Sequence, residues 1–170
     1  MKEFGLRIPV CCWLMSRGLS PVLECSSLRH CDIVGIRFEG KPLRLTEMVA
    51  MELKLSNVSE VIRQCLCHVE RVNETWAAMP MAVALRSVDR FAETLIGLLG
   101  IDGAGKCHIL NPALGAKDCD LLPWKNLIRR RTEYVWRMKH PQMLRFPAMR
   151  LVLAENNRAA KERAGSEDGV

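Results

Sequence analysis

The sequence lacks any long hydrophobic run. No stretch approaches the roughly 20 consecutive apolar residues that a membrane-spanning helix needs, so no membrane partner is expected. The longest early apolar stretch, Ile8 to Met15, contains Pro9 and follows the charged Glu3 and Arg7. It is too short, and too charged in front, to be typical of a secretory signal. We therefore expect a cytoplasmic protein.

The sequence also lacks the C-x-x-C spacing of common zinc and redox motifs, although it contains 8 cysteines. Cys65 and Cys67 are separated by one residue and followed by His68. A helix points positions i and i+2 apart, so this trio is a poor scaffold for tetrahedral zinc. An even number of cysteines permits disulfides in principle. In the absence of a secretory signal, reduced and mostly buried thiols are the favoured interpretation.

The length and composition are those of one soluble domain. The chain has 170 residues, of which 49% are hydrophobic and 26% charged. A chain of this length can bury a hydrophobic core without disulfides or metals, and a second full domain is not expected. We assign residues 1–122 to the core, 123–155 to a basic helical extension and 156–170 to a disordered polar tail.

The positive charge is concentrated in one segment. The chain carries a net charge of +6, yet residues 1–124 have equal numbers of basic and acidic side chains. Residues 125–150 hold eight basic side chains against one acidic side chain, Glu133. This pattern predicts a polyanionic partner such as DNA, although a solvated basic face fits the charge equally well. The candidate nucleic-acid-binding residues are Lys125, Arg129, Arg130, Arg131, Arg137 and Lys139.

The pattern of apolar residues predicts a mixed α/β domain with one central sheet flanked by helices. The expected elements, in chain order, are a helix over 2–17, strands over 21–25, 31–39 and 47–55, a helix over 58–72, a strand over 74–79, a helix over 83–94, and a hairpin of strands 96–101 and 106–110. The helix over 58–72 has the strongest signals. Asn57 can cap it, Glu60 stands three residues later as in a capping box, and an apolar stripe follows.

Two charged residues interrupt an apolar strand, namely Glu52 and Lys54 in the segment Met-Glu-Leu-Lys. Side chains alternate along a strand, so these two share one face, about 7 Å apart at the backbone. Burying a lone charge is costly, which favours a working pair in a cleft at the strand end. A surface ion pair is the alternative, and an E-x-K triplet is common by chance.

An acidic residue on the preceding strand strengthens this interpretation. Asp32 stands twenty residues before Glu52. If the strands over 31–38 and 48–55 pair as a hairpin, Asp32 can lie beside Glu52. Two carboxylates with a backbone carbonyl can bind a hard divalent cation, which prefers oxygen ligands.

These residues resemble the motif of the PD-(D/E)XK nuclease superfamily, the fold of many restriction enzymes and Holliday-junction resolvases. The matching residues are Asp32, then Glu52 and Lys54, then Gln64 in the following helix. The resemblance covers about residues 3–113. Two positions depart from the family pattern: Cys31 stands where a proline is usual, and His68 stands four residues after Gln64, where a tyrosine is usual.

The resemblance implies a restriction-endonuclease-like fold and metal-dependent hydrolysis of DNA. Asp32, Glu52 and the Leu53 carbonyl would hold Mg²⁺, for which Mn²⁺ could substitute, and the metal would activate a water. Lys54 would position that water or stabilise the transition state, and Gln64 would orient the substrate or the lysine. Cutting both strands of a duplex would favour a homodimer.

Other candidates have simpler interpretations. His68 and His30 are expected to be packing or turn residues, and His108 has no recognisable partner. Asp102-Gly-Ala-Gly-Lys106 lacks the spacing of a P-loop and is predicted to be a turn. Three function classes remain: an active nuclease, a catalytically silent nucleic-acid-binding or regulatory protein of the same fold, and an unrelated structural α/β domain.

Overall fold

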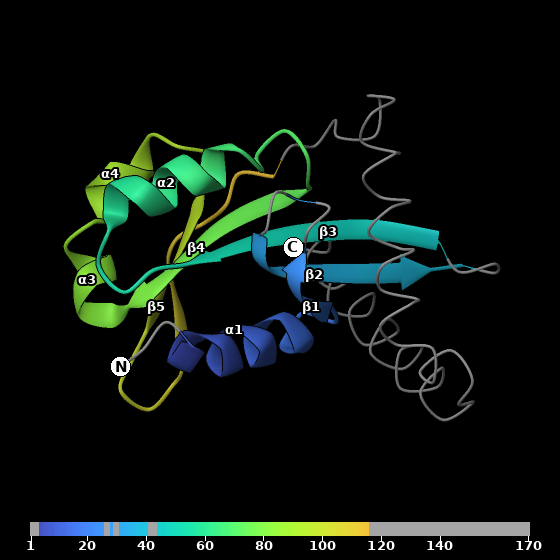
Figure 1. The fold of residues 1–170 in the computed structure, drawn as a ribbon, viewed down its shortest axis with the longest axis horizontal. Coiled ribbons are helices and arrows are strands. Elements are labelled where there is room, and N and C mark those ends of the chain that lie inside the picture. Colours follow the sequence, from blue (N-terminus) through green and yellow to red (C-terminus); the bar gives the residue numbers. More distant parts are fainter. Residues whose placement is uncertain (1–3, 26–27, 29–30, 41–43, 116–170) are drawn as a thin grey trace, which may run out of the picture.

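The computed structural model of the chain describes residues 4–25, 28, 31–40 and 44–115 (Figure 1). The expected extension over 123–155, its six candidate DNA-binding residues and the tail over 156–170 lie outside the described residues. The elements are α1 (Phe4–Ser16), β1 (Ser20–Cys25), β2 (Cys31–Glu39), β3 (Arg44–Leu53), α2 (Val58–Leu66), β4 (Glu74–Pro80), α3 (Met81–Leu85), α4 (Val88–Ala92), β5 (Gly97–Ile101) and β6 (Cys107–Asn111).

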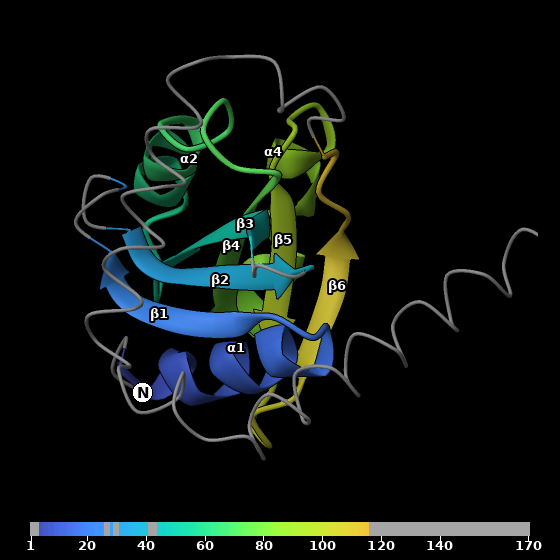
Figure 2. The same ribbon diagram turned by 90° about the vertical axis from the view of Figure 1, so that its right-hand side faces the viewer.

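The strands form one mixed sheet, in which the order in space is the order in the chain, from β1 to β6. The strands β3, β4 and β5 are parallel to one another, and the remaining pairs are antiparallel. Helices flank both faces: α1 lies on one side, and α2, α3 and α4 lie on the other (Figures 1 and 2). The predicted α/β fold with a mixed central sheet is confirmed.

The two faces of β3 show why residues 48–51 are apolar at consecutive positions. Val49, Met51 and Leu53 pack with α1 in one buried cluster, as the alternation predicts. Met48 and Ala50 point to the opposite face and pack with β1 and β2. A third cluster lies where α2, α3 and α4 cover β4 and β5. A strand that is buried on both faces needs apolar residues at consecutive positions.

The helix α2 is shorter than predicted. Its N-terminus is as expected, because the Asn57 side chain accepts a hydrogen bond of 3.1 Å from the Glu60 amide. The helix ends at Leu66 instead of residue 72, and the His68 amide bonds to the Cys65 carbonyl in a tighter turn. This turn buries His68, which is 2% exposed.

The single helix expected over 83–94 is two short helices, α3 and α4. They meet at Ser87, whose hydroxyl donates a hydrogen bond of 2.8 Å to the Val83 carbonyl. A serine bonded to the carbonyl four residues earlier favours a bend in a helix. In α1, by contrast, Pro9 lies inside the helix, which begins at Phe4.

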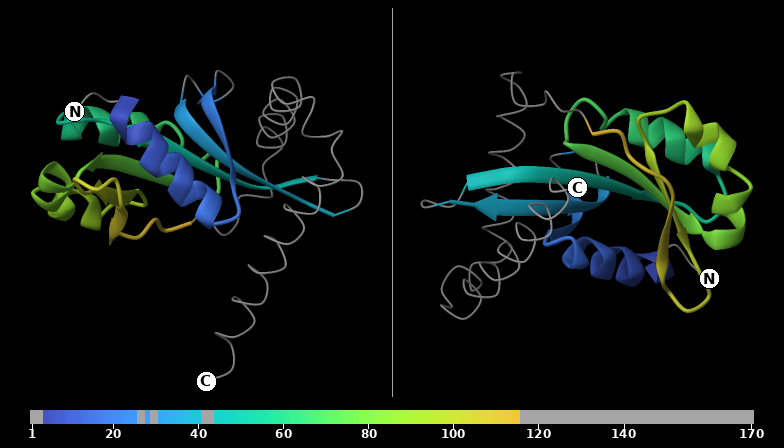
Figure 3. Two further views of the ribbon diagram at one scale, coloured as in Figure 1. Left: turned by 90° about the horizontal axis from the view of Figure 1, so that it is seen from below. Right: turned by 180° about the vertical axis from the view of Figure 1, so that it is seen from behind.

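An aromatic and ionic cluster links α1 to β4, and α1 runs obliquely across the face of the sheet opposite α2 (Figure 3). The rings of Trp13 and Trp76 meet edge to face, with their centroids 5.0 Å apart. Arg17 lies over both rings and makes two hydrogen bonds, of 2.7 and 2.9 Å, to the Glu74 carboxylate. Trp76 sits opposite Gly97 on β5, where a Cβ atom would lie 2.2 Å from its ring.

Within the described ranges, the protein has no helix that is both long and apolar enough to cross a membrane.

Candidate functional site

The strands β2 and β3 bring Asp32 beside the end of β3. Ile33 pairs with Met51 across the two antiparallel strands, so Asp32 is level with Glu52 one step further along. The Leu53 amide donates a hydrogen bond of 2.9 Å to Asp32 Oδ2. The hairpin that the sequence predicted thus holds the first carboxyl group of the motif against the strand that carries the second.

Asp32 lies in an environment that resists its ionisation. Burial is the main cause that raises the pKa of Asp32, and the Leu53 hydrogen bond acts against it. Glu52 raises the pKa further, through repulsion and through a side-chain hydrogen bond, whereas the charge of Lys54 lowers it. Glu52 and Lys54 therefore both lie close enough to Asp32 to act on its carboxyl group.

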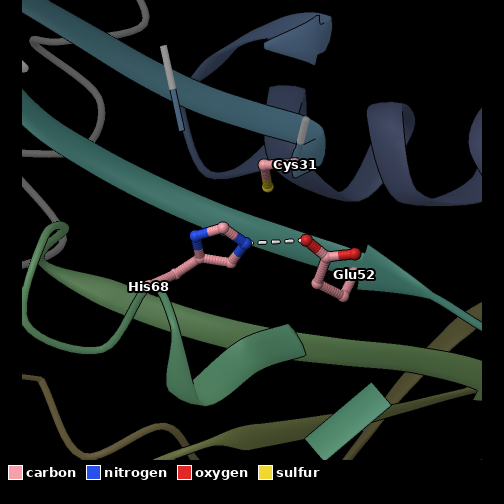
Figure 4. Close-up of side chains that lie close together, drawn as sticks. All are labelled: Cys31, Glu52 and His68. Atoms are coloured by element: carbon pink, nitrogen blue, oxygen red, sulfur yellow. Dashed lines mark hydrogen bonds and ion pairs between the residues drawn. The ribbon is translucent and has the colours of Figure 1, made fainter. Parts of the chain in front are cut away.

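Glu52 is buried, with only 3% of its surface exposed. It follows Met48 and Ala50 on alternate positions of β3, so it points to the face covered by α2. There its Oε1 lies 2.7 Å from Nε2 of His68 (Figure 4). The alternative of an exposed ion pair at the strand end is wrong for Glu52, because a buried histidine is its partner.

Cys31 points its sulfur toward the contact between Glu52 and His68 (Figure 4). One sulfur, one carboxyl oxygen and one ring nitrogen from Cys31, Glu52 and His68 all lie within 4.8 Å of one another. The Cys31 thiol is near the Ile33 and Met51 carbonyls, at 3.3 and 3.4 Å. Burial, and next the Glu52 carboxyl group, raise the pKa of this thiol well above its usual range.

The other two predicted site residues are Lys54 and Gln64. Lys54 is half-buried just beyond β3, and its amide continues the parallel ladder with a 3.1 Å hydrogen bond to the Ala78 carbonyl. Gln64 lies on α2, as expected. Its Oε1 atom is buried and makes no hydrogen bond within the described residues. Lys54 therefore makes no hydrogen bond to Gln64 Oε1, and the predicted role of Gln64 in orienting Lys54 has no support from this atom.

Two neighbours of Glu52 were not predicted from the sequence. Cys31 and His68 are the two positions that depart from the family pattern, and both lie against the motif glutamate. His68 is buried, as a packing residue is, and its ring also contacts Glu52. The two departures were the signal that could have found them. His30 lies outside the described residues.

The turn over 102–106 is confirmed as a structural feature. Asp102 Oδ1 accepts hydrogen bonds of 2.9 Å from the Ala104 and Lys106 amides, in the loop between β5 and β6. The statement that His108 has no partner is wrong, because its Nε2 lies 2.8 Å from Asp102 Oδ2. That hydrogen bond is the main cause of the lowered pKa of Asp102.

Comparisons with known proteins support the fold and no more. No protein-family model matches the chain, and no curated protein matches it. Among solved structures, the SPO1766 protein of unknown function from Silicibacter pomeroyi is similar, with a TM-score of 0.57 and 21% sequence identity. The match covers 84% of this chain and 90% of that one. At this identity the likeness concerns the architecture of the sheet and helices alone.

Proposed function

We propose that the protein is a metal-dependent nuclease that hydrolyses DNA phosphodiester bonds at Asp32, Glu52 and Lys54. The observation that carries the proposal is the placement of Asp32 beside Glu52 at one end of β2 and β3, with the charge of Lys54 acting on Asp32. This arrangement supports the resemblance to PD-(D/E)XK nucleases, in which those three residue types carry out the reaction.

The donor set fits a hard divalent cation. Asp32 and Glu52 offer carboxyl oxygens, and their mutual repulsion contributes to the raised pKa of Asp32. A cation between two such groups relieves this repulsion and takes the oxygen ligands that Mg²⁺ prefers. Asp32, Glu52 and the Leu53 carbonyl would hold it. When bound, it lowers the pKa of a water and offsets charge on the phosphoryl oxygens.

The chain's own residues have separable roles in this proposal. Leu53 fixes Asp32 through its amide, so this carboxylate is oriented before the substrate binds. His68 fixes Glu52 in the same way from the side of α2. Lys54 supplies a positive charge beside Asp32 and stabilises negative charge that develops on the phosphoryl oxygens.

The second candidate is a catalytically silent nucleic-acid-binding or regulatory protein of the same fold. The burial of Glu52 favours it, because one oxygen of this carboxyl group is already engaged by His68. The basic segment over 125–150 serves both candidates, since DNA binding needs positive charge whether or not cleavage follows.

The deciding experiment is a cleavage assay on plasmid and linear DNA with Mg²⁺, with Mn²⁺ and with a chelator. We expect metal-dependent cleavage that Glu52→Gln abolishes and that the exposed control Glu70→Gln retains. Cleavage that survives the Glu52 change belongs to another site or a contaminant. An inactive wild type that still binds DNA would favour the silent protein.

A further inference from the structure

A second set of metal-ligand atoms shares Glu52 with the proposed catalytic site and lies on the side of Glu52 that faces His68. Cys31 comes from the start of β2, Glu52 from the end of β3, and His68 from the turn after α2 (Figure 4). Their ligand atoms lie within 4.8 Å of one another, and all three residues are buried. Three separate segments therefore bring sulfur, oxygen and nitrogen donors to one point.

The spacing is close to that of a zinc shell. Bonds of about 2.0–2.3 Å at tetrahedral angles place ligand atoms about 3.3–3.7 Å apart. The widest pair here must close by at most about 1 Å, and the Glu52–His68 pair, at 2.7 Å, must open slightly. Rotations of the three side chains can make such shifts without moving the strands.

The hydrogen bonds of the chain leave this cluster incomplete. His68 Nε2 contacts Glu52, but Nδ1 is buried and has no hydrogen-bond partner in the described part of the chain. A neutral imidazole has one donor and one acceptor nitrogen, so either tautomer leaves one of them unpaired here. Nε2 is the nitrogen that faces Glu52 and Cys31, so a cation held by this cluster would bind Nε2, whereas Nδ1 points away from it (Figure 4).

We propose that Cys31, Glu52 and His68 form a buried binding site for a borderline divalent cation of the Zn²⁺ class. A thiolate and an imidazole select Zn²⁺ or Co²⁺ over Mg²⁺, which prefers oxygen alone. Cys31 binds as the thiolate, and its proton leaves to solvent. Three protein ligands leave the fourth position for water.

This site is separate from the proposed catalytic one, although both use Glu52. Oε1 of Glu52 faces His68 and belongs to this cluster, whereas the second carboxyl oxygen of Glu52 is left for the proposed catalytic metal. The zinc site needs neither Asp32 nor Lys54, and it stands whether or not the protein cleaves DNA. The two proposals can therefore fail independently.

The test is a Co²⁺ titration of the metal-free protein, followed by competition with Zn²⁺ and with excess Mg²⁺. We expect one equivalent of Co²⁺ to give visible bands of tetrahedral intensity and a thiolate-to-cobalt charge-transfer band. Zn²⁺ should abolish both, and Mg²⁺ should leave both unchanged. Cys31→Ser should remove the charge-transfer band and weaken binding more than about 100-fold, beyond the effect of losing a group outside the metal shell.

Three further variants separate metal binding from folding and catalysis. His68→Gln keeps an N–H that can bond to Glu52 but lacks the imidazole ligand, so it should fold and lose the bands. Cys25→Ser removes a buried thiol that faces Cys31 on β1 and should keep them. Asp32→Asn should also keep them, even if it abolishes cleavage. Unchanged bands in folded His68→Gln, or no charge-transfer band in the wild type, would overturn the proposal.

Discussion

The amide of Leu53 donates to Oδ2 of Asp32 at 2.9 Å, so the strand that carries Glu52 also orients the carboxyl group facing it. Leu53 thus positions the proposed ligand Asp32 through its N–H, and its own carbonyl is a second proposed ligand. The relative placement of the two carboxyl groups therefore depends on the backbone of β3, which is hydrogen-bonded to β2 on one side and to β4 on the other.

This hydrogen bond separates structure from chemistry at Asp32. Asp32→Asn keeps an oxygen that can accept from the Leu53 amide, whereas Asp32→Ala does not. We expect both variants to lose Mg²⁺-dependent cleavage, and only the alanine variant to lose about 1–3 kcal/mol of unfolding free energy for the unpaired amide. Urea unfolding and cleavage assays on both variants check this. Equal stability of the two variants would contradict it.

Lys54 is expected to act on turnover rather than on metal binding. Lys54→Ala removes a charge and leaves Asp32 and Glu52 in place. We expect turnover to fall about 10²–10³-fold, as for the loss of one preorganised electrostatic donor, with the Mg²⁺ concentration dependence little changed. Lys106→Ala removes an exposed lysine in the β5–β6 loop and is the matched control. A shift in Mg²⁺ dependence without loss of turnover would refute this role.

The Arg17–Glu74 pair should make stability depend on pH. Burial is the largest single influence and would raise the pKa of Glu74, but the hydrogen bonds and charge of Arg17, the Trp76 hydrogen bond and the charge of Arg37 together outweigh it, and the pKa is lowered from 4.5. Its stabilisation is therefore full above that value and is lost as the pH falls through the lowered pKa. Glu74→Gln should cost about 1.5–3 kcal/mol near neutral pH, and the difference from wild type should shrink in acid. A difference that stays constant with pH would show that the charge of Glu74 is irrelevant.

Gly97 is expected to tolerate no side chain. A Cβ there would lie 2.2 Å from the Trp76 ring, and that ring is held by Trp13 and Glu74. Gly97→Ala should therefore destabilise the fold by about 1–3 kcal/mol, as overpacking does. Gly103→Ala has nothing within 4 Å of the added atom and is the control. Thermal melts of the two variants should differ accordingly.

The basic segment should bind phosphates without reading sequence. Replacing Arg129, Arg130 and Arg131 by alanine should weaken DNA binding equally for different sequences. The slope of log affinity against log salt should become shallower by up to about 0.9 for each lost contact. Fluorescence anisotropy at several salt concentrations measures the slope. An unchanged slope would show that this segment is a solvated face.

The fold followed from local patterns. The alternation in β2 and β3 and the cap at Asn57 predicted a hairpin followed by a helix, and the register then placed Asp32 near Glu52. The contact of His68 with Glu52 did not follow from the periodicity, because it depends on where α2 ends. Apolar residues continue past Leu66, so the periodicity predicts a longer helix. In the structure a turn replaces the last part of that helix and places His68 against Glu52 on β3.

The spatial order of the strands, which follows the chain without exception, bears on how fast the protein folds. Each strand pairs with its successor, so no pairing has to wait for a distant part of the chain. The two parallel pairings, β3 with β4 and β4 with β5, close the longest loops, and the antiparallel pairings close short ones. Low sequence separation between partners accelerates folding, since less chain entropy is lost before contacts form. The hairpin of β2 and β3, which carries Asp32 and Glu52, can therefore form before the helical crossovers close over it.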